Sequence, residues 1–163
     1  MNAMKITSSD IEKAVARMFD IRKNLIVPNI SWGLNLHECD LLIINGNGYA
    51  TEVEIKVSKA DLKADLNKKH GHISKRIKYL YYAVPEELVD FAFEILPNHV
   101  GIIQCFRISE TNMRVDAVRI RRPKSINAFI KMPEKDIHKL ALLGVMRYWN
   151  LRFQQPKDVF DIF

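Results

Sequence analysis

Charged and apolar side chains alternate along the segment from Thr51 to Val57. Glu52, Glu54 and Lys56 fall on every second position, so a strand here would point all three side chains to one face. Two carboxylates and an ammonium group on a single face are costly to bury, because each charge loses its hydration unless it is paired or bound to a metal ion. The pattern therefore predicts either a set of structural ion pairs or a metal-binding site.

A further acid, Asp40, precedes an apolar run, and the Asn-Gly-Asn-Gly sequence at 45–48 then predicts a β-hairpin. With a loop of two or four residues, Asp40 would lie opposite Val53 and share the apolar face. With a three-residue loop that ends on Gly48 in the left-handed conformation, Asp40 pairs with Glu54. We predict the three-residue loop, or a bulge with the same effect, because only that register brings the two acids together.

The segments before this hairpin carry the signals of a helix and a strand. Ser9 and Glu12 have the spacing of a capping box, which predicts that a helix begins there. Leu25–Ile30 is rich in β-branched residues but is interrupted by Pro28, which predicts an edge or leading strand. The four hydrophobic residues after Asp40 leave no solvent-facing side, so that strand is predicted to be covered on both faces.

The residues after the hairpin predict a capped helix. Ser58-Lys-Ala-Asp61 has the spacing of a second capping box, and the helix is predicted to run to about Lys69 or His70. Leu62 and Leu66 are predicted to supply its apolar side.

Further elements follow in the sequence. They are a buried strand at Tyr79–Val84, a helix from Pro85 to about Ile95, a strand at Val100–Ile108, its hairpin partner at Arg114–Ile120, and a last long helix from Pro133. One face of the last helix is predicted to carry Ile137, Leu140, Ala141, Gly144, Val145 and Tyr148.

The predicted order is helix, strand, two-stranded hairpin, helix and strand, with Asp40 starting the second strand and Glu54-Ile55-Lys56 near the end of the third. This arrangement resembles the restriction-endonuclease-like, or PD-(D/E)xK, nuclease superfamily. The stretch from about Glu38 to Gly101 is similar more narrowly to the MmcB-type DNA-repair endonucleases and their phage relatives. One departure is Cys39, which stands where the motif has a proline before the aspartate.

The resemblance implies an α/β protein with the restriction-endonuclease-like fold, in which a mixed central sheet is flanked by helices. The αβββαβ core would occupy about residues 8–105, and an additional hairpin and helix would occupy about residues 106–163. A single nuclease-like domain would then span residues 1–163.

The resemblance also implies an activity, that of a Mg²⁺- or Mn²⁺-dependent DNA endonuclease that hydrolyses phosphodiester bonds in DNA repair or phage DNA metabolism. Asp40, Glu54 and the backbone carbonyl of Ile55 would bind the metal ion, and such hard oxygen ligands suit Mg²⁺. Lys56 would orient or help to deprotonate the attacking water. Glu12 is the candidate for the helix-borne acid that many relatives direct at the metal.

The charge balance is a mild argument for a polyanionic partner, because 25 Lys and Arg face 19 Asp and Glu, a net charge of +6. The candidate nucleic-acid-binding residues are Ser58, Lys69, His70, Lys75 and Arg76. Further basic residues that would contact the DNA backbone, or form ordinary solvated faces, are Lys78, Arg119, Arg121, Arg122 and Lys124.

Many of these residues also have a structural interpretation. Asp40, Glu54 and Lys56 would alternatively form a cross-strand salt bridge, Glu12 and Ser58 would be helix caps, Glu38 an ion-pair partner of Lys56 or an arginine, and Glu52 a buried hydrogen-bonding residue. Asp61 and Asp65 are predicted to be surface acids that pair with Lys68 and Lys69. His37 and Cys39 offer two zinc ligands without a second pair, so no zinc site is predicted.

The length of 163 residues and the 48% hydrophobic content are typical of one globular domain. The two cysteines make no disulfide framework, no apolar run reaches membrane-spanning length, and the N-terminus lacks a signal-peptide core, so a cytoplasmic protein without a membrane partner is predicted. A homodimer would allow paired cuts, although no interface is marked. The alternatives to a nuclease are a non-catalytic nucleic-acid-binding protein that retains the fold, and an interaction module that uses the last helix and the apolar tail.

Overall fold

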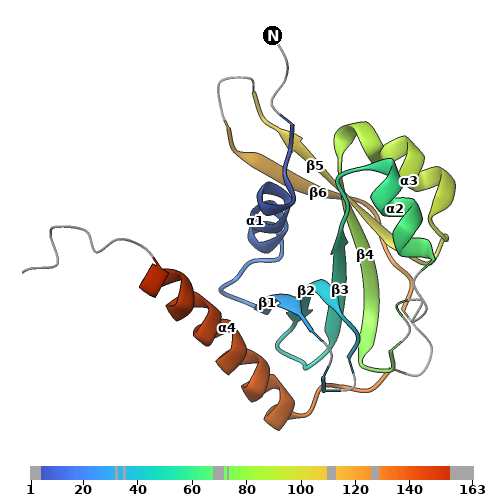
Figure 1. The fold of residues 1–163 in the computed structure, drawn as a ribbon. Helices are drawn as coiled ribbons and strands as arrows, with labels where there is room; N and C mark the ends of the chain where they lie inside the picture. The colour runs from blue at the N-terminus through green and yellow to red at the C-terminus, as the bar shows by residue number, and fades with distance from the viewer. Residues whose placement is uncertain are drawn as a thin grey trace, which may run out of the picture.

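The computed structural model describes residues 5–31, 33–34, 36–67, 72, 74–109, 113–125 and 129–154, and its helices flank a central sheet (Figure 1). The helices are α1 (Ser8–Met18), α2 (Lys59–Leu66), the 3₁₀-helix η1 (Glu86–Leu88), α3 (Val89–Ile95) and α4 (Glu134–Gln154). The strands are β1 (Leu25–Ile30), β2 (Cys39–Ile44), β3 (Ala50–Ile55), β4 (Ile77–Pro85), β5 (Gly101–Arg107) and β6 (Val115–Arg121).

The strands form one mixed sheet of six strands in the order β1-β2-β3-β4-β5-β6. The pairs β1–β2, β2–β3 and β5–β6 are antiparallel, whereas β3–β4 and β4–β5 are parallel. Parallel neighbours need a crossover connection, and α2 and then η1 with α3 provide the two crossovers. The α/β class, the mixed sheet and the order of elements through β4 are therefore as the sequence predicts.

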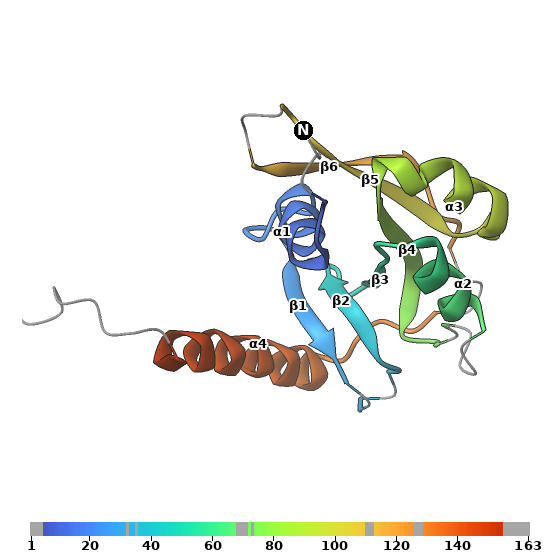
Figure 2. The ribbon, with the colours of Figure 1, turned by 45° about the horizontal axis from the view of Figure 1, so that its top comes forward.

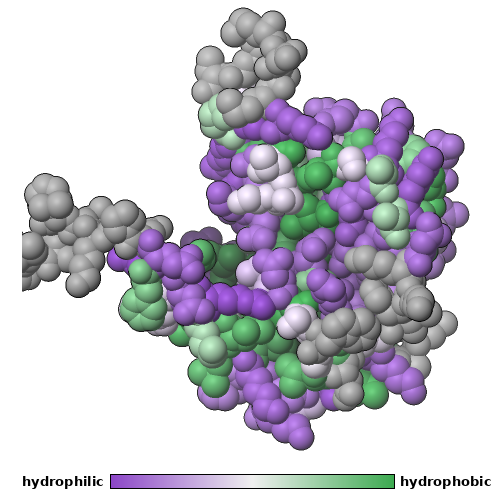
Figure 3. Space-filling model, viewed as in Figure 1, coloured by the Kyte–Doolittle hydropathy of each residue, from purple (hydrophilic) through white to green (hydrophobic). Residues whose placement is uncertain are grey.

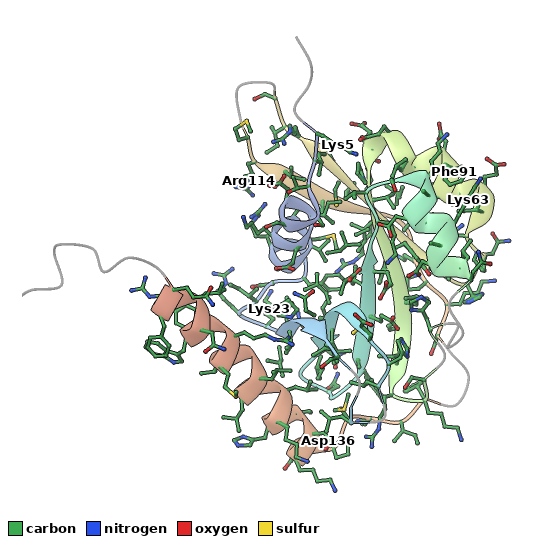
Figure 4. The ribbon with its side chains drawn as sticks, viewed as in Figure 1. Lys5, Lys23, Lys63, Phe91, Arg114 and Asp136 are labelled. Carbon is green, nitrogen blue, oxygen red and sulfur yellow. The ribbon has the colours of Figure 1, made fainter. Side chains whose placement is uncertain are left out.

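Helices cover both faces of the sheet, as Figure 2 shows by placing α1 on the other side of β4 from α2 and α3. Successive residues of β4 point to opposite faces of the sheet and belong to different hydrophobic clusters. Tyr81 and Ala83 pack with α1 on one face, whereas Tyr82 and Val84 pack with α2 and α3 on the other. The side chains of α2 and α3 also meet directly, because the Lys63 ammonium lies 5.5 Å from the centre of the Phe91 ring (Figure 4).

The hairpin between β2 and β3 has the predicted three-residue loop. The Asn45 N–H donates to the Tyr49 carbonyl at 3.1 Å, and the Gly48 N–H donates to the Asn45 carbonyl at 2.9 Å. Gly48 has φ +79°, in the left-handed region that glycine adopts without steric cost. The register pairs Leu41 with Val53, so the next residue of each strand places Asp40 beside Glu54.

The start of α1 differs from the sequence prediction. The capping box uses Thr7 and Asp10 instead of Ser9 and Glu12: the Asp10 N–H donates to Thr7 Oγ1 at 3.2 Å, and the Thr7 N–H donates to Asp10 Oδ2 at 3.0 Å. Thr7-Ser-Ser-Asp10 has the same spacing two residues earlier, so periodicity alone did not separate the two boxes. The Glu12 side chain therefore takes no part in the capping box.

Helix α2 begins at the predicted cap, because the Asp61 N–H donates to Ser58 Oγ at 3.1 Å. Leu62 is fully buried, but Leu66 is 41% exposed, so the prediction that Leu66 supplies the apolar side is wrong. The helix is described as far as Leu66, and the predicted end at Lys69 or His70 lies outside the described residues.

Helix α4 packs apolar side chains on the sheet along its first half only, whereas Arg147 in its second half donates to the backbone carbonyls of Pro28 and Asn29 in β1. Leu140 is buried and Ile137 and Leu143 are partly buried, whereas Val145 and Tyr148 are 51% and 56% exposed, so the predicted apolar face is wrong over the second half. The reason is that α4 continues past β1, the edge strand of the sheet (Figures 1 and 2).

Polar side chains cover much of the molecular face seen in Figure 3. Of the described helices, none combines the length and apolar character that crossing a membrane requires.

Candidate active site

Lys56 brings three carboxylates together just past the end of β3. Its Nζ atom lies 2.6 Å from Glu54 Oε2, 3.0 Å from Asp65 Oδ1 and 3.6 Å from Asp40 Oδ2. Asp40, Glu54 and Lys56 therefore lie on the same face of the sheet, around one nitrogen atom. Glu38, which the sequence offered as another partner of Lys56, is exposed.

The backbone fixes the position of Lys56, because its N–H donates to the Ala83 carbonyl at 3.1 Å and so extends the parallel pairing of β3 with β4. Asp65 reaches the lysine from α2, where it lies on the same inward face as Leu62, one turn earlier. Asp65 is 2% exposed, so the prediction of a surface acid is wrong. A buried ammonium group needs carboxylate partners, and α2 turns Asp65 inward to supply one.

The burial of these charges changes their protonation. Burial raises the pKa of Glu54 to about 7, an effect that Lys56 partly offsets and the charge of Asp40 reinforces. Burial by itself lowers the pKa of Lys56, but the carboxylates of Glu54, Asp40 and Asp65 more than compensate and hold it above its usual value. Lys56 therefore stays charged at neutral pH, whereas Glu54 is poised to exchange a proton.

Asp40 connects the cluster to open space. Its Oδ2 atom accepts the N–H of Ile55 at 2.7 Å, which ties the start of β2 to the end of β3. Asp40 and Ile55 also line a cavity of about 260 Å³, whose other lining residues are Ser8, Ser9, Glu12 and Asn29. The charged cluster is thus buried on one side and accessible on the other.

Helix α1 places Glu12 in the same cavity. Burial raises the pKa of Glu12, Lys13 lowers it, and the negative charge of Asp40 raises it again. Sequence analysis left Glu12 as either a helix cap or a site acid, and the capping role belongs to Thr7 and Asp10.

These residues fit a hard divalent cation. The carboxylates of Asp40 and Glu54 already face one cationic atom, Lys56 Nζ, and Ile55 and Glu12 line the adjoining cavity. Mg²⁺ and Mn²⁺ prefer carboxylate, carbonyl and water oxygens, which is the donor set present here. The donors on which the sequence prediction depends are therefore close together.

A second buried cluster centres on Glu52. Both Glu52 carboxylate oxygens lie 2.8 Å from His37 Nε2, and Oε1 lies 2.7 Å from His72 Nδ1. His72 Nε2 lies 2.7 Å from Asp65 Oδ2, to which the Tyr82 hydroxyl also donates at 2.6 Å. Glu52 has the buried hydrogen-bonding position that the sequence allowed, and Asp65 joins this cluster to Lys56.

The histidines control the ionisation of this second cluster. Burial alone raises the pKa of Glu52, but hydrogen bonds from His37 and His72 more than offset it, so the net pKa is lowered. Burial lowers the pKa of His72, but contacts with Asp65 and Glu52 raise it to about 9. At neutral pH, His72 is therefore an imidazolium ion between two carboxylates.

His37, Asp65 and Tyr82 were not predicted to join a site, and the sequence left His72 as either a phosphate contact or an ordinary helix-end residue. One signal was available for Asp65, which follows Leu62 at the i, i+3 spacing of a shared helix face. The histidines gave no such signal, because each lies in a connection whose path depends on tertiary packing.

Three of the predicted nucleic-acid-binding residues, Ser58, Lys75 and Arg76, lie within the described part of the chain. Ser58 caps α2, and Arg76 Nη2 lies 3.7 Å from Asp136 Oδ2 at the start of α4. Lys75 is exposed. Lys69 and His70 lie outside the described residues.

Three arginines lie in β6 or directly after it. Arg121 has a structural contact, since its Nε donates to the Val100 carbonyl at 2.8 Å. Arg119 and Arg122 line a hollow of about 550 Å³ together with Tyr79 and Tyr81. Cationic and aromatic side chains of this kind suit the backbone and bases of a nucleic acid.

No protein-family model matches the chain, and none of the curated proteins matches it. Among solved structures, the chain is similar to the SPO1766 protein of unknown function from Silicibacter pomeroyi. The TM-score is 0.70 and the sequence identity 22%, over 97% of this chain and 99% of that chain. This likeness shows a shared fold over nearly the whole chain.

Proposed function

We propose that the chain is a Mg²⁺-dependent DNA endonuclease with the restriction-endonuclease-like, PD-(D/E)xK, fold. The observation that carries the proposal is the convergence of Asp40, Glu54 and Lys56, in which Lys56 Nζ lies 3.6 Å and 2.6 Å from the two carboxylates. Burying such charges is a poor way to stabilise a fold, because hydrophobic residues of similar size do so at least as well. Perturbed acids beside a cavity are more typical of functional sites.

Asp40, Glu54 and the Ile55 carbonyl would hold the metal ion, Mg²⁺ or Mn²⁺, with Glu12 directed into the same cavity. When bound by these residues, the ion would supply Lewis acidity toward the scissile phosphate and toward a bound water molecule. Lys56 keeps its charge and lies next to both acids, so it is placed to orient the attacking water and to offset negative charge on the phosphate.

The DNA would be held by surfaces outside this cluster. The hollow lined by Arg119, Arg122, Tyr79 and Tyr81 combines positive charge with aromatic rings, which supports binding of a nucleic-acid strand. The sequence likeness to MmcB-type endonucleases suggests DNA repair or phage DNA metabolism as the setting.

The test is cleavage of plasmid and branched DNA by the full chain, with Mg²⁺ or with a chelator. We expect metal-dependent cleavage that Glu54→Gln lowers by about 100-fold or more. Glu38→Gln is the matched control, because Glu38 is an exposed carboxylate two residues before Asp40. Cleavage that persists at the wild-type rate in Glu54→Gln contradicts the proposal.

A second candidate is a nucleic-acid-binding protein that retains this fold without turnover. The observation in its favour is that Lys56 already lies within 4 Å of three carboxylates, so each of these acids has a cationic partner without a metal ion. Salt-sensitive DNA binding without cleavage under any divalent ion would favour this alternative.

A further inference from the structure

Three side chains from distant parts of the sequence meet around Glu52. His37 comes from the connection before β2, Glu52 from the middle of β3, and His72 from the connection after α2. One ligand atom from each, His37 Nε2, a Glu52 carboxylate oxygen and His72 Nδ1, lies within 4.8 Å of the other two. All three residues are at most 5% exposed. Two imidazoles and one carboxylate are a ligand set that binds Zn²⁺ in proteins.

The spacing of these atoms is close to what zinc requires. The nitrogen–oxygen distances are 2.7 to 2.8 Å. Tetrahedral bonds of about 2.0 to 2.1 Å separate neighbouring donor atoms by about 3.3 Å. With an opening of roughly half an ångström at each nitrogen–oxygen contact, and release to solvent of the protons that His37 Nε2 and His72 Nδ1 donate to Glu52, the cluster becomes a coordination site with a fourth position left for water or another donor.

The surroundings hold one ligand ring in the required orientation. His72 presents Nδ1 to Glu52 while its Nε2 lies 2.7 Å from Asp65 Oδ2. A carboxylate bound to the second nitrogen of a histidine is the usual way in which proteins fix a metal-binding imidazole. The two imidazole rings are nearly perpendicular, at 81°, with centroids 5.4 Å apart, so they approach Glu52 from different directions.

The neighbouring group of Glu54, Asp65 and His72 also has closely spaced ligand atoms. However, this group offers a single imidazole, and its Glu54 belongs to the proposed Mg²⁺ site, so it suits a transition metal less well. Within the described residues, the hydrogen-bond partners of the Glu52 side chain are the two imidazoles. The ligand set thus favours the Glu52 cluster for a transition metal.

We propose that His37, Glu52 and His72 bind one Zn²⁺ ion, separate from the site of Asp40 and Glu54. Imidazole nitrogen suits zinc and is a poor ligand for Mg²⁺, so the two sites select different ions. Sequence analysis predicted no zinc site because His37 lacked a second ligand pair nearby, and the fold supplies the missing ligands from β3 and from the segment after α2.

The experiment uses the full chain, stripped with a chelator and dialysed. Zn²⁺ binding is followed by calorimetry in the presence of excess Mg²⁺, and Co²⁺ is added separately as a visible probe of coordination. We expect one Zn²⁺ per chain, no competition from Mg²⁺, and Co²⁺ absorption of the intensity typical of tetrahedral sites. Failure of the wild-type protein to bind Zn²⁺, or binding that Mg²⁺ abolishes, overturns the proposal without reference to any variant.

Variants locate the site. His37→Gln and Glu52→Gln are each expected to weaken Zn²⁺ binding by about 100-fold or more, since loss of even an outer partner costs 10- to 100-fold. His99→Gln is the control, because His99 is an exposed histidine. Circular dichroism of each variant shows whether it is folded. A folded His37→Gln protein with wild-type Zn²⁺ affinity contradicts this assignment.

Discussion

Lys56 Nζ and Asp65 Oδ1 lie 3.0 Å apart and join the end of β3 to the inner face of α2. The same carboxylate accepts the Tyr82 hydroxyl and contacts His72, so one aspartate serves both buried clusters. The position of α2 on the sheet thus depends on charge as well as on the burial of Leu62.

Asp65→Asn removes the negative charge but keeps the shape of the side chain. We expect the free energy of unfolding to fall by about 3 to 5 kcal/mol, because a buried ammonium and a buried imidazolium each lose a carboxylate partner. Urea denaturation measures the change. Asp61→Asn, one turn earlier on α2, is the control and should stay within about 0.5 kcal/mol of wild type. Equal stabilities for the two variants would contradict the structural role of Asp65.

Two substitutions of Asp40 distinguish its role in folding from its role in the proposed chemistry. Asn at this position still accepts the Ile55 N–H but no longer brings a charge, whereas Ala leaves that N–H without its acceptor. We expect Asp40→Asn to lose Mg²⁺-dependent cleavage with little change in stability. Asp40→Ala should lose cleavage and also about 1 to 3 kcal/mol of stability. Thermal unfolding and plasmid cleavage on the same samples check both; an Asp40→Asn protein that cleaves normally would remove this residue from the mechanism.

The pKa of His72, raised to about 9 from its ordinary 6.5, predicts how stability varies with pH. Because the folded state holds this proton more tightly than the unfolded state, the stabilisation is complete below pH 6.5 and is lost as the pH rises through 9. We expect the free energy of unfolding, measured with a chelator present, to fall by up to about 3 kcal/mol over this range. His72→Gln should remove most of the slope. A slope unchanged in that variant would assign it to another group.

The raised pKa of Glu54 leads us to expect that Mg²⁺ binding depends on pH. Because burial raises its pKa to about 7, a proton competes with Mg²⁺ below that pH. The affinity for Mg²⁺ is therefore expected to be about tenfold lower at pH 6 than at pH 8. Calorimetric titration at the two pH values measures the ratio. Equal affinities would show that Glu54 is not a metal ligand.

The local features of the fold were predictable from the sequence. The register of β2 and β3 follows from a loop of Gly46, Asn47 and Gly48 and from the period-two pattern of Glu52 and Glu54, and both signals involve neighbouring residues. Strands β4, β5 and β6 likewise lie within a residue or two of their predicted ranges.

The interactions between elements were not predictable in the same way. Whether Asp65 or Leu66 faces the sheet depends on how α2 is rotated about its axis. In the structure Asp65 faces the sheet, where it pairs with Lys56 just past the end of β3. The partners of Glu52 lie at positions 37 and 72, and no sequence spacing connects them. The second half of α4 is exposed because the sheet ends at β1. The helical spacing of Val145 and Tyr148 predicts an apolar face but not whether another element covers it.

The hydrogen bond from the Ile55 N–H to Asp40 has an evolutionary consequence. An aspartate that closes the gap between two strands would be retained by selection for folding even in a descendant that had abandoned hydrolysis. Finding this residue in a homologue is therefore no guarantee of a working enzyme, and inactive members of such a lineage would keep the outward signature of active ones.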